Sequence, residues 1–226
     1  MTEKKSDRTA AKKRSEQAVH ELITRIDTHP GDADAYYELA TVLVDLKSFA
    51  QAEELLMKAL GLFQAQPAVV DKLHYGLGNV YYAAEDYPKA IQQFDSLGAQ
   101  WKGTGYLMLA QSYMANGDHK RALAFALTAL ASQPDDVATL QVVGKNLLAL
   151  GNMTQAAQYY DQLLAIDPKN GRATFDRGLV AMVLGTPYAD YFERAQTLDP
   201  QYFEQGQQRL ADIEKFMQQT PDSDQQ

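Results

Sequence analysis

Apolar residues recur along the chain three or four positions apart, with polar residues between them. In one segment Leu77 and Tyr81 share a predicted helical face and are followed, after a short polar break, by Ala90 and Phe94. Apolar positions at this spacing form one face of an α-helix. The segment therefore predicts two short amphipathic helices that pack on each other, with Asp86 in the turn between them.

The same unit recurs along the chain. The first predicted helix of each copy carries one small residue, which allows a neighbouring helix to approach closely. These small residues are Ala40, Gly78, Ala110, Gly144 and Gly178, at spacings of 38, 32, 34 and 34 residues. In the first four copies an alanine always follows twelve positions later, at Ala52, Ala90, Ala122 and Ala156. A fixed helix pair with linkers of variable length produces this pattern.

This frame resembles the tetratricopeptide repeat (TPR), with His74 in the place usually held by tryptophan. The resemblance covers about residues 33–200 and implies an all-α fold, a right-handed superhelical α-solenoid of stacked antiparallel helix pairs. In the fifth copy Arg177 replaces an apolar residue and the turn near Thr186 is shorter by two residues, so this copy is degenerate. The expected repeats are 33–66, 71–102, 103–136, 137–170 and, in the degenerate form, 171–200.

Three flanking segments complete the expected organisation. Residues 1–32 predict a basic helix or an incomplete repeat, residues 201–219 an amphipathic capping helix, and residues 220–226 a disordered tail. The beginning of the chain is rich in basic residues, namely Lys4, Lys5, Arg8, Lys12, Lys13 and Arg14. We interpret these as the solvated start of a helix, with a basic docking arm as the alternative.

Composition excludes several classes of function. The 226 residues carry a formal net charge of −8 and include no cysteine. The acidic balance argues against nucleic acid as a partner, because phosphate binding depends on clustered Lys and Arg. No stretch is apolar over the roughly 20 residues that a membrane span needs, and no secretory leader is recognisable. The sequence therefore predicts a cytoplasmic protein without membrane insertion.

Catalytic, cofactor and metal motifs are not found. The histidines at 20, 29, 74 and 119 are scattered, and no pair has the spacing of metal ligands. The short Gly76-x-Gly78 element lacks the rest of any phosphate-binding fingerprint. We therefore expect no cofactor, no metal and no enzymatic activity.

The family resemblance implies a ligand groove along the first helix of every repeat, at its second, fifth, ninth and twelfth positions. In this sequence the groove residues are Tyr37, Thr41, Lys72, Tyr75, Asn79, Tyr82, Leu107, Gln111, Met114, Gln141, Lys145, Arg172 and Phe175. A stripe of aromatic, Leu and Met side chains on a surface is typical of an interaction site. The residues with which the chaperone-binding branch of the family reads a terminal carboxylate are absent, since Ala138 and Val142 stand at two of those places.

These features predict a scaffold that binds a protein or peptide partner through the groove. Asn79 and Gln111 offer donors and acceptors to a peptide backbone, and Met114 offers an adaptable apolar surface. The alternative is a self-associating module that forms a homodimer through the same stripe or through the terminal repeats. A further alternative is that the C-terminal helix folds back and buries the stripe.

Overall fold

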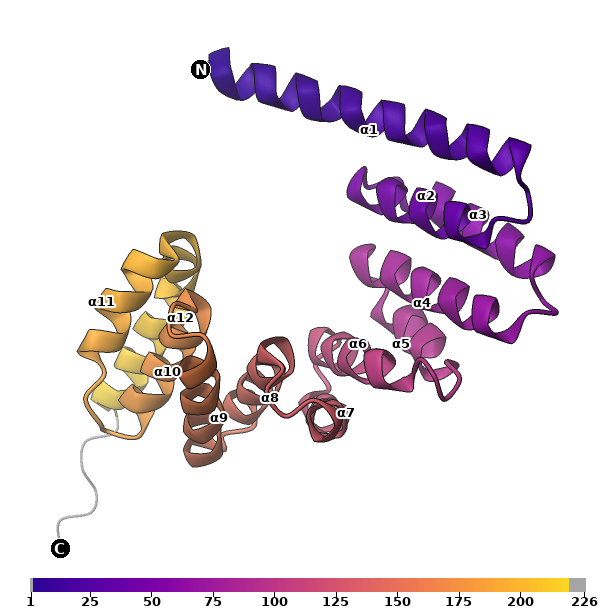
Figure 1. Ribbon diagram of the computed structural model, residues 1–226. Helices are drawn as coiled ribbons and strands as arrows, with labels where there is room; N and C mark the ends of the chain where they lie inside the picture. The colour runs from indigo at the N-terminus through magenta and orange to yellow at the C-terminus, as the bar shows by residue number, and fades with distance from the viewer. Residues whose placement is uncertain (1, 220–226) are drawn as a thin grey trace, which may run out of the picture. The chain divides into compact units, whose positions relative to one another are not determined.

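The computed structural model describes the backbone of residues 2–219 and the side chains of residues 14–213 and 215. Twelve helices and no strand occur within this range (Figure 1). The helices are α1 (Thr2–Thr28), α2 (Ala33–Asp45), α3 (Phe49–Leu62), α4 (Pro67–Ala83), α5 (Tyr87–Asp95), α6 (Lys102–Ala115), α7 (His119–Ser132), α8 (Val137–Ala149), α9 (Met153–Ile166), α10 (Gly171–Val183), α11 (Ala189–Leu198) and α12 (Pro200–Gln219). The expected tail at 220–226 and the basic side chains before Arg14 lie outside the described residues.

The chain divides into two compact units, Met1–Gly117 and Asp118–Gln226, which we call unit 1 and unit 2. Unit 1 contains α1–α6 and unit 2 contains α7–α12. Within each unit successive helices pack on each other, and α2 also packs on α4. Each unit is therefore built by stacking helix pairs. No helix within residues 2–219 has both the length and the apolar character that crossing a membrane requires.

Unit 1 is held together by the apolar faces that the sequence pattern predicts. Leu56, Leu73, Leu77, Ala90 and Phe94 are all buried. Gly78 sits where α4 and α5 meet, and a Cβ atom there would lie only 2.4 Å from the Phe94 ring. The small residue is thus required for the close approach of the two helices, and any larger side chain would push the ring out of the core.

Aspartates and one asparagine cap the first turns of several helices. The Asp32 carboxylate accepts hydrogen bonds from the backbone N–H groups of Asp34 and Ala35, and Asp86 accepts from Lys89 N–H. In unit 2 Asp118 and Asn170 cap α7 and α10 in the same way. Such caps satisfy backbone donors that a helix leaves unpaired at its first turn, each contributing about 1 kcal/mol.

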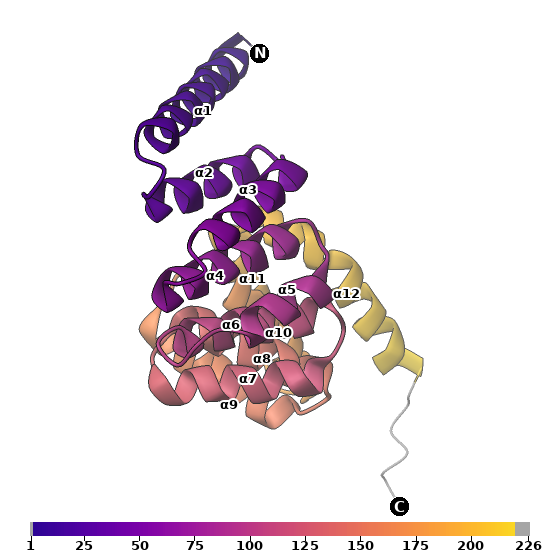
Figure 2. The same cartoon turned by 90° about the vertical axis from the view of Figure 1, so that its right-hand side faces the viewer.

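The last helix, α12, packs against both α10 and α11. Its partly buried side chains Tyr202, Phe203, Leu210 and Ile213 cover a buried cluster of apolar residues. This cluster consists of Phe175, Leu179, Met182, Phe192 and Ala195. Figure 2 shows that the last turns of α12 extend away from the other helices of unit 2.

Candidate functional site

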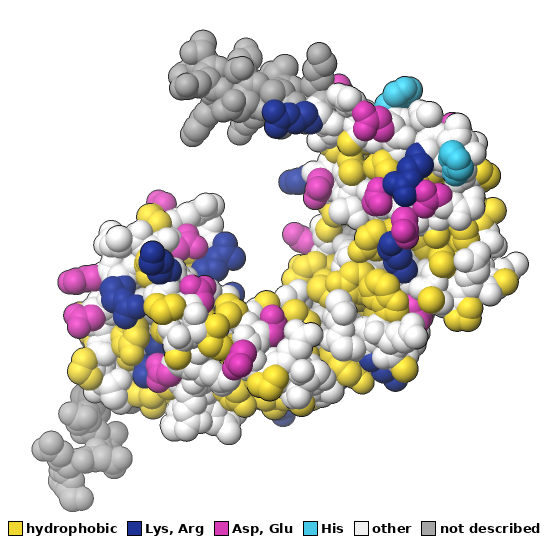
Figure 3. Space-filling model, viewed as in Figure 1, with side chains coloured by type: hydrophobic (Ala, Val, Ile, Leu, Met, Phe, Trp, Pro, Cys, Tyr) yellow, Lys and Arg dark blue, Asp and Glu magenta, His cyan; other side chains and the backbone are white. Residues whose placement is uncertain are grey.

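In unit 1 the predicted groove residues lie on α2, α4 and α6, the first helices of their pairs. We call them the unit 1 stripe: Tyr37, Thr41, Lys72, Tyr75, Asn79, Tyr82, Leu107, Gln111 and Met114. All are half-buried except Thr41, which is exposed. Apolar side chains gather on this face over α4 and α6 (Figure 3). The stripe is therefore partly open to solvent and rich in large apolar groups.

Tyr37 is fixed between α2 and α4. Its ring lies against the backbone of α4 at Gly76, where a Cβ atom would be 3.1 Å from the ring. The Lys72 ammonium lies 4.9 Å from the centre of the same ring and 2.6 Å from Asp34 Oδ1. Lys72 thus joins α4 to α2 through a cation–π contact and an ion pair, and its position restricts the ring.

Tyr75 lies next to Tyr37 and extends the aromatic surface toward α6. Its ring makes an edge contact with Phe94, at 5.6 Å between centroids, and a tilted contact with Trp101 at 5.3 Å. Burial raises the pKa of both the Tyr37 and Tyr75 hydroxyls, and the neighbouring Asn79 amide opposes that rise. Both phenols are therefore neutral at physiological pH and can donate as well as accept hydrogen bonds.

Trp101 is a part of this surface that the sequence reasoning missed. It stands immediately before α6, at the end of the expected repeat 71–102, and the groove positions of the repeat lie on first helices, so no positional rule assigns it to the groove. The available signal was composition, because it is the only tryptophan in the chain.

Tyr82 and Thr41, two further members of the stripe, differ in whether their hydroxyl groups are already used in hydrogen bonds within the chain. Tyr82 makes an edge contact with Tyr87 at 5.7 Å, and burial raises the pKa of its hydroxyl. The Thr41 hydroxyl donates to the Tyr37 carbonyl oxygen at 3.0 Å, so this donor is already used within α2. The polar chemistry of the stripe therefore rests mainly on phenol and amide groups.

Unit 2 differs, because α12 covers one of the corresponding positions. Phe175, predicted in an open groove, is a fully buried core residue with 0% exposure. Its ring contacts those of Phe192, Tyr202 and Phe203 at 5.5, 5.8 and 5.6 Å. The alternative in which the C-terminal helix buries the stripe thus applies to Phe175. The repeat pattern gave no indication that Phe175 is buried, because α12, which covers it, lies outside the repeats.

A buried carboxylate joins α12 to α10. Asp176 has 0% exposure, and its oxygens accept hydrogen bonds from Tyr202 Oη and from Arg209 Nη2, all at 3.1 Å. Burial raises the pKa of Asp176, while Lys145 and Arg209 oppose the rise. Burial also raises the pKa of Tyr202, to about 12. Tyr202 and Arg209 both belong to α12, so the docking of this helix is polar as well as apolar.

The remaining predicted residues of unit 2 lie near this carboxylate. Lys145 is half-buried on α8, and Arg172 is exposed on α10. Both lie 5.5 Å from the centre of the Tyr202 ring. Gln141, one turn before Lys145, is half-buried, and its Nε2 atom has no hydrogen-bond partner. The structure therefore brings Lys145 and Arg172 together around a residue of α12.

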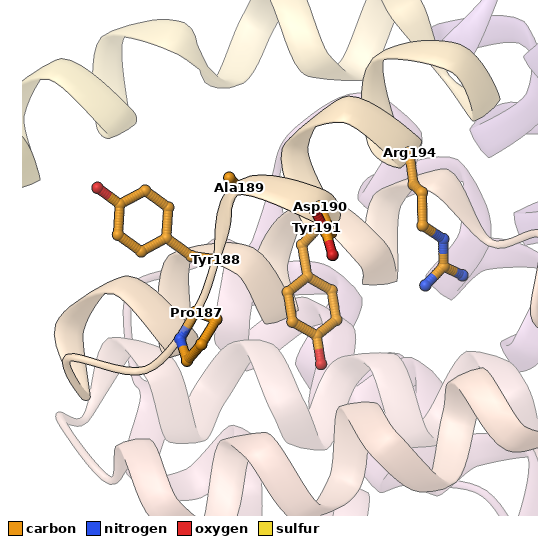
Figure 4. A pocket seen from close by; sticks show the side chains of 6 residues that line it. All are labelled: Pro187, Tyr188, Ala189, Asp190, Tyr191 and Arg194. Carbon is orange, nitrogen blue, oxygen red and sulfur yellow. The ribbon is translucent and has the colours of Figure 1, made fainter.

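An open pocket of about 510 Å³ lies at the shortened turn before α11. Figure 4 shows the side chains that line it, with the Tyr188 and Tyr191 rings pointing in different directions and the Arg194 guanidinium apart from both. No set of polar groups converges in it. Among the described side chains no group of three or more His, Asp or Glu residues could hold a metal ion.

Two models of the tetratricopeptide repeat match the chain. One matches residues 33–66 and 104–136, and the other matches residues 144–203. Together these matches account for more than half of the chain.

Two relatives share part of the sequence. The chain is 26% identical over 151 residues to the TPR repeat-containing protein YpiA of Bacillus subtilis (strain 168), a match that covers 63% of this chain and 34% of that protein. It is 34% identical over 64 residues to the DnaJ homolog subfamily C member 3 homolog of Dictyostelium discoideum, covering 28% of this chain and 13% of that protein. The chain thus spans about a third or less of these relatives.

Solved structures with the same arrangement of helices are more distant in sequence. YrrB, described as a TPR protein with an unusual peptide-binding site, has a TM-score of 0.61 and 21% identity over 80% of this chain and 93% of that one. PilF of Pseudomonas aeruginosa has a TM-score of 0.72 and 20% identity over 88% of this chain and 92% of that one. These likenesses show the fold, and the expected class, an all-α solenoid of tetratricopeptide-type helix pairs, is confirmed.

Proposed function

The chain belongs to the tetratricopeptide repeat family, and from this premise we propose that it is a scaffold that binds a protein or peptide partner across the unit 1 stripe. Extended peptides or partner helices would lie over α2, α4 and α6. Their apolar side chains would contact the rings of Tyr75 and Tyr82, and their backbone groups would meet Asn79 and Gln111.

The observation that carries this proposal is the arrangement of Tyr37, Lys72, Tyr75 and Asn79. The two rings are held by contacts within the unit, at Gly76 for Tyr37 and at Trp101 for Tyr75. Half-buried aromatic rings that are already fixed lose little conformational entropy on binding, and their hydroxyl groups add directional contacts. All four remain half-buried, so each still presents part of its surface to a ligand.

A peptide-display selection on the full chain tests the proposal. Enriched peptides are synthesised, and their affinities are measured by fluorescence anisotropy for the wild type and for the double variant Tyr75→Ala/Tyr82→Ala. We expect the double variant to lose at least about tenfold in affinity, because two anchors of a buried aromatic contact are truncated. The matched control is Tyr188→Ala, which removes an exposed tyrosine from unit 2.

Equal affinities for the wild type and the double variant would contradict the unit 1 stripe as the ligand site. Circular dichroism melts of each variant establish that loss of affinity does not come from loss of fold. That the chain is not an enzyme and that it is cytoplasmic stay predictions.

The alternative function, a self-associating module, is favoured by two exposed apolar side chains of unit 1. Met57 and Leu62 on α3 are 55% and 54% exposed, which is high for large apolar side chains. Sedimentation equilibrium of the full chain distinguishes the two roles. A dimer that Met57→Lys converts to a monomer would support self-association through α3, and a monomer at high micromolar concentration would contradict it.

A further inference from the structure

Three cationic side chains from three different helices surround one tyrosine ring in unit 2. Lys145 Nζ of α8 and Arg172 Cζ of α10 each lie 5.5 Å from the centre of the Tyr202 ring, and Arg209 Cζ of α12 lies 5.7 Å from it. We call Lys145, Arg172 and Arg209 the cation cluster. The ring can attract a cation on each of its faces, but it cannot neutralise three positive charges.

The carboxylates in contact with the cluster balance two of these charges. Arg209 pairs with the buried Asp176 at 3.1 Å, and Arg172 pairs with Asp199 at 3.3 Å. Lys145 forms no ion pair with any described carboxylate. Burial lowers the pKa of Lys145, and the neighbouring Arg209 and Arg172 act in the same direction, while Asp176 opposes them. The Lys145 ammonium thus lies near two other positive charges, and no described carboxylate pairs with it directly to balance its own charge.

A half-buried ammonium without a paired carboxylate is costly, because it loses part of its hydration and gains no contact ion in return. The cost is greater here because two guanidinium groups lie around the same ring. An external anion placed beside Lys145 and Arg172 would offset both the desolvation and the repulsion. Arg172 is exposed, so this side of the cluster is open to a ligand.

A second donor on α8 points to the same face. Gln141 stands one helical turn before Lys145, and its Nε2 atom is buried without a hydrogen-bond partner. Residues four apart on a helix lie on one side of it, so the amide and the ammonium are neighbours. Buried donors without acceptors are uncommon in folded proteins, and this amide is available to donate to a carboxylate that pairs with Lys145.

We propose that the cation cluster of unit 2 is a binding site for the side-chain carboxylates of an acidic peptide segment in a partner protein. The ligand carboxylate pairs with Lys145 and Arg172, while Arg209 stays on Asp176 and holds α12 in place. This site extends the proposed function to unit 2 with a stated ligand chemistry, and it does not require the unit 1 stripe. The small number of cations favours a peptide over nucleic acid, because phosphate binding depends on many clustered Lys and Arg, whereas this cluster offers only Lys145 and Arg172 to a ligand.

The probe is a fluorescein-labelled hexaglutamate peptide with an amidated C terminus, and the neutral comparison is hexaglutamine with the same label. Binding to the full chain is measured by fluorescence anisotropy at low and at physiological salt. We expect Lys145→Gln to weaken hexaglutamate binding by about tenfold, since it removes one charge-assisted contact. Lys145→Arg, which keeps the charge, should retain binding within about threefold of the wild type.

The matched control is Lys169→Gln, which removes one positive charge from an exposed position of the same unit. It should change the affinity by less than about twofold, because screening reduces distant surface charges. Equal losses for Lys145→Gln and Lys169→Gln would overturn the site, and so would equal binding of hexaglutamine. Tighter binding of a single-stranded oligothymidylate than of hexaglutamate, again lost in Lys145→Gln, would overturn the peptide in favour of a nucleic-acid phosphate.

The double variant Tyr75→Ala/Tyr82→Ala separates this proposal from the function proposed above. It should bind hexaglutamate like the wild type, because both changes lie in unit 1. A double variant that loses display-selected peptides but keeps hexaglutamate supports two separate sites. Loss of hexaglutamate binding in this variant would contradict a site confined to unit 2, whatever happens to the selected peptides.

Discussion

A Cβ atom on Gly206 of α12 would lie 2.3 Å from the Phe175 ring of α10. Real Cβ atoms do not approach a ring this closely, so either the ring or the helix would have to move. Phe175 is fully buried and surrounded by other rings, which leaves it little room. Glycine at 206 is therefore what allows α12 to lie flat on α10 and to bring Tyr202 and Arg209 onto Asp176.

Gly206→Ala should destabilise unit 2 even though alanine is the better helix former. The propensity gain is about 1 kcal/mol, whereas overpacking against a buried ring costs about 1–3 kcal/mol and also weakens the contacts of α12. Urea unfolding followed by circular dichroism measures the net effect. The matched control is Gly61→Ala in α3, where an added Cβ meets nothing within 4 Å, and it should leave stability unchanged or raise it. A Gly206→Ala protein as stable as Gly61→Ala would contradict the close contact.

The buried Asp176 predicts a specific dependence of stability on pH. Burial raises its pKa in the folded chain above the ordinary value of 3.8. The folded state therefore binds the proton more tightly than the unfolded state, and this group stabilises the fold most at low pH. Its contribution is lost as the pH rises from about 3.8 through the raised pKa of Asp176.

Asp176→Asn removes this titration while keeping the shape of the side chain. The difference in unfolding free energy, wild type minus variant, should therefore fall as the pH rises from 4 and then level off. Urea titrations at a series of pH values measure it, and Asp190→Asn, at an exposed position of the same unit, serves as the control. A difference that stays constant or increases over this range would show that the pairing with Arg209 outweighs burial.

The helix pairs were predictable because their determinants are local in sequence. Gly78 and Phe94 stand at fixed positions in one repeating frame, and the contact between them follows from that frame. The placement of Tyr37, Tyr75 and Asn79 on one surface follows for the same reason, since each occupies a set position on a first helix.

The α12 contacts were not predictable, because they depend on geometry beyond the repeats. Nothing in the sequence frame relates Gly206 to Phe175, and the amphipathic pattern of α12 indicates only that one of its faces is buried. Trp101 was not predicted for a related reason, since it lies between α5 and α6, where the frame assigns no groove position. The cation cluster combines residues of three helices. The repeat frame placed Lys145 and Arg172 on first helices, but it could not place Arg209, which lies on α12.

The contact between Lys72 and Tyr37 predicts measurable coupling between α2 and α4. The ammonium lies 4.9 Å from the ring centre and also pairs with Asp34. A double-mutant cycle with Lys72→Met and Tyr37→Leu should give a coupling free energy of about 0.5–1 kcal/mol, as expected for a cation–π contact that is partly open to water. Performing the cycle with Lys58→Met, an exposed lysine on α3, should give coupling near zero. A zero result for the Lys72 cycle would show that the contact has no energetic role.

Trp101 provides an intrinsic probe of the unit 1 stripe, because it is the only tryptophan and its ring lies 5.3 Å from that of Tyr75. Removing the neighbouring ring with Tyr75→Ala exposes more of the indole to water, so its emission maximum should shift to longer wavelength in the folded protein. Tyr188→Ala, in unit 2, should leave the emission unchanged. A peptide that binds over the stripe should have the opposite effect, shifting the wild-type emission to shorter wavelength as it covers the indole. If a peptide binds with an affinity that depends on Tyr75 but leaves Trp101 emission unaltered, the ligand does not extend to the α6 end of the stripe.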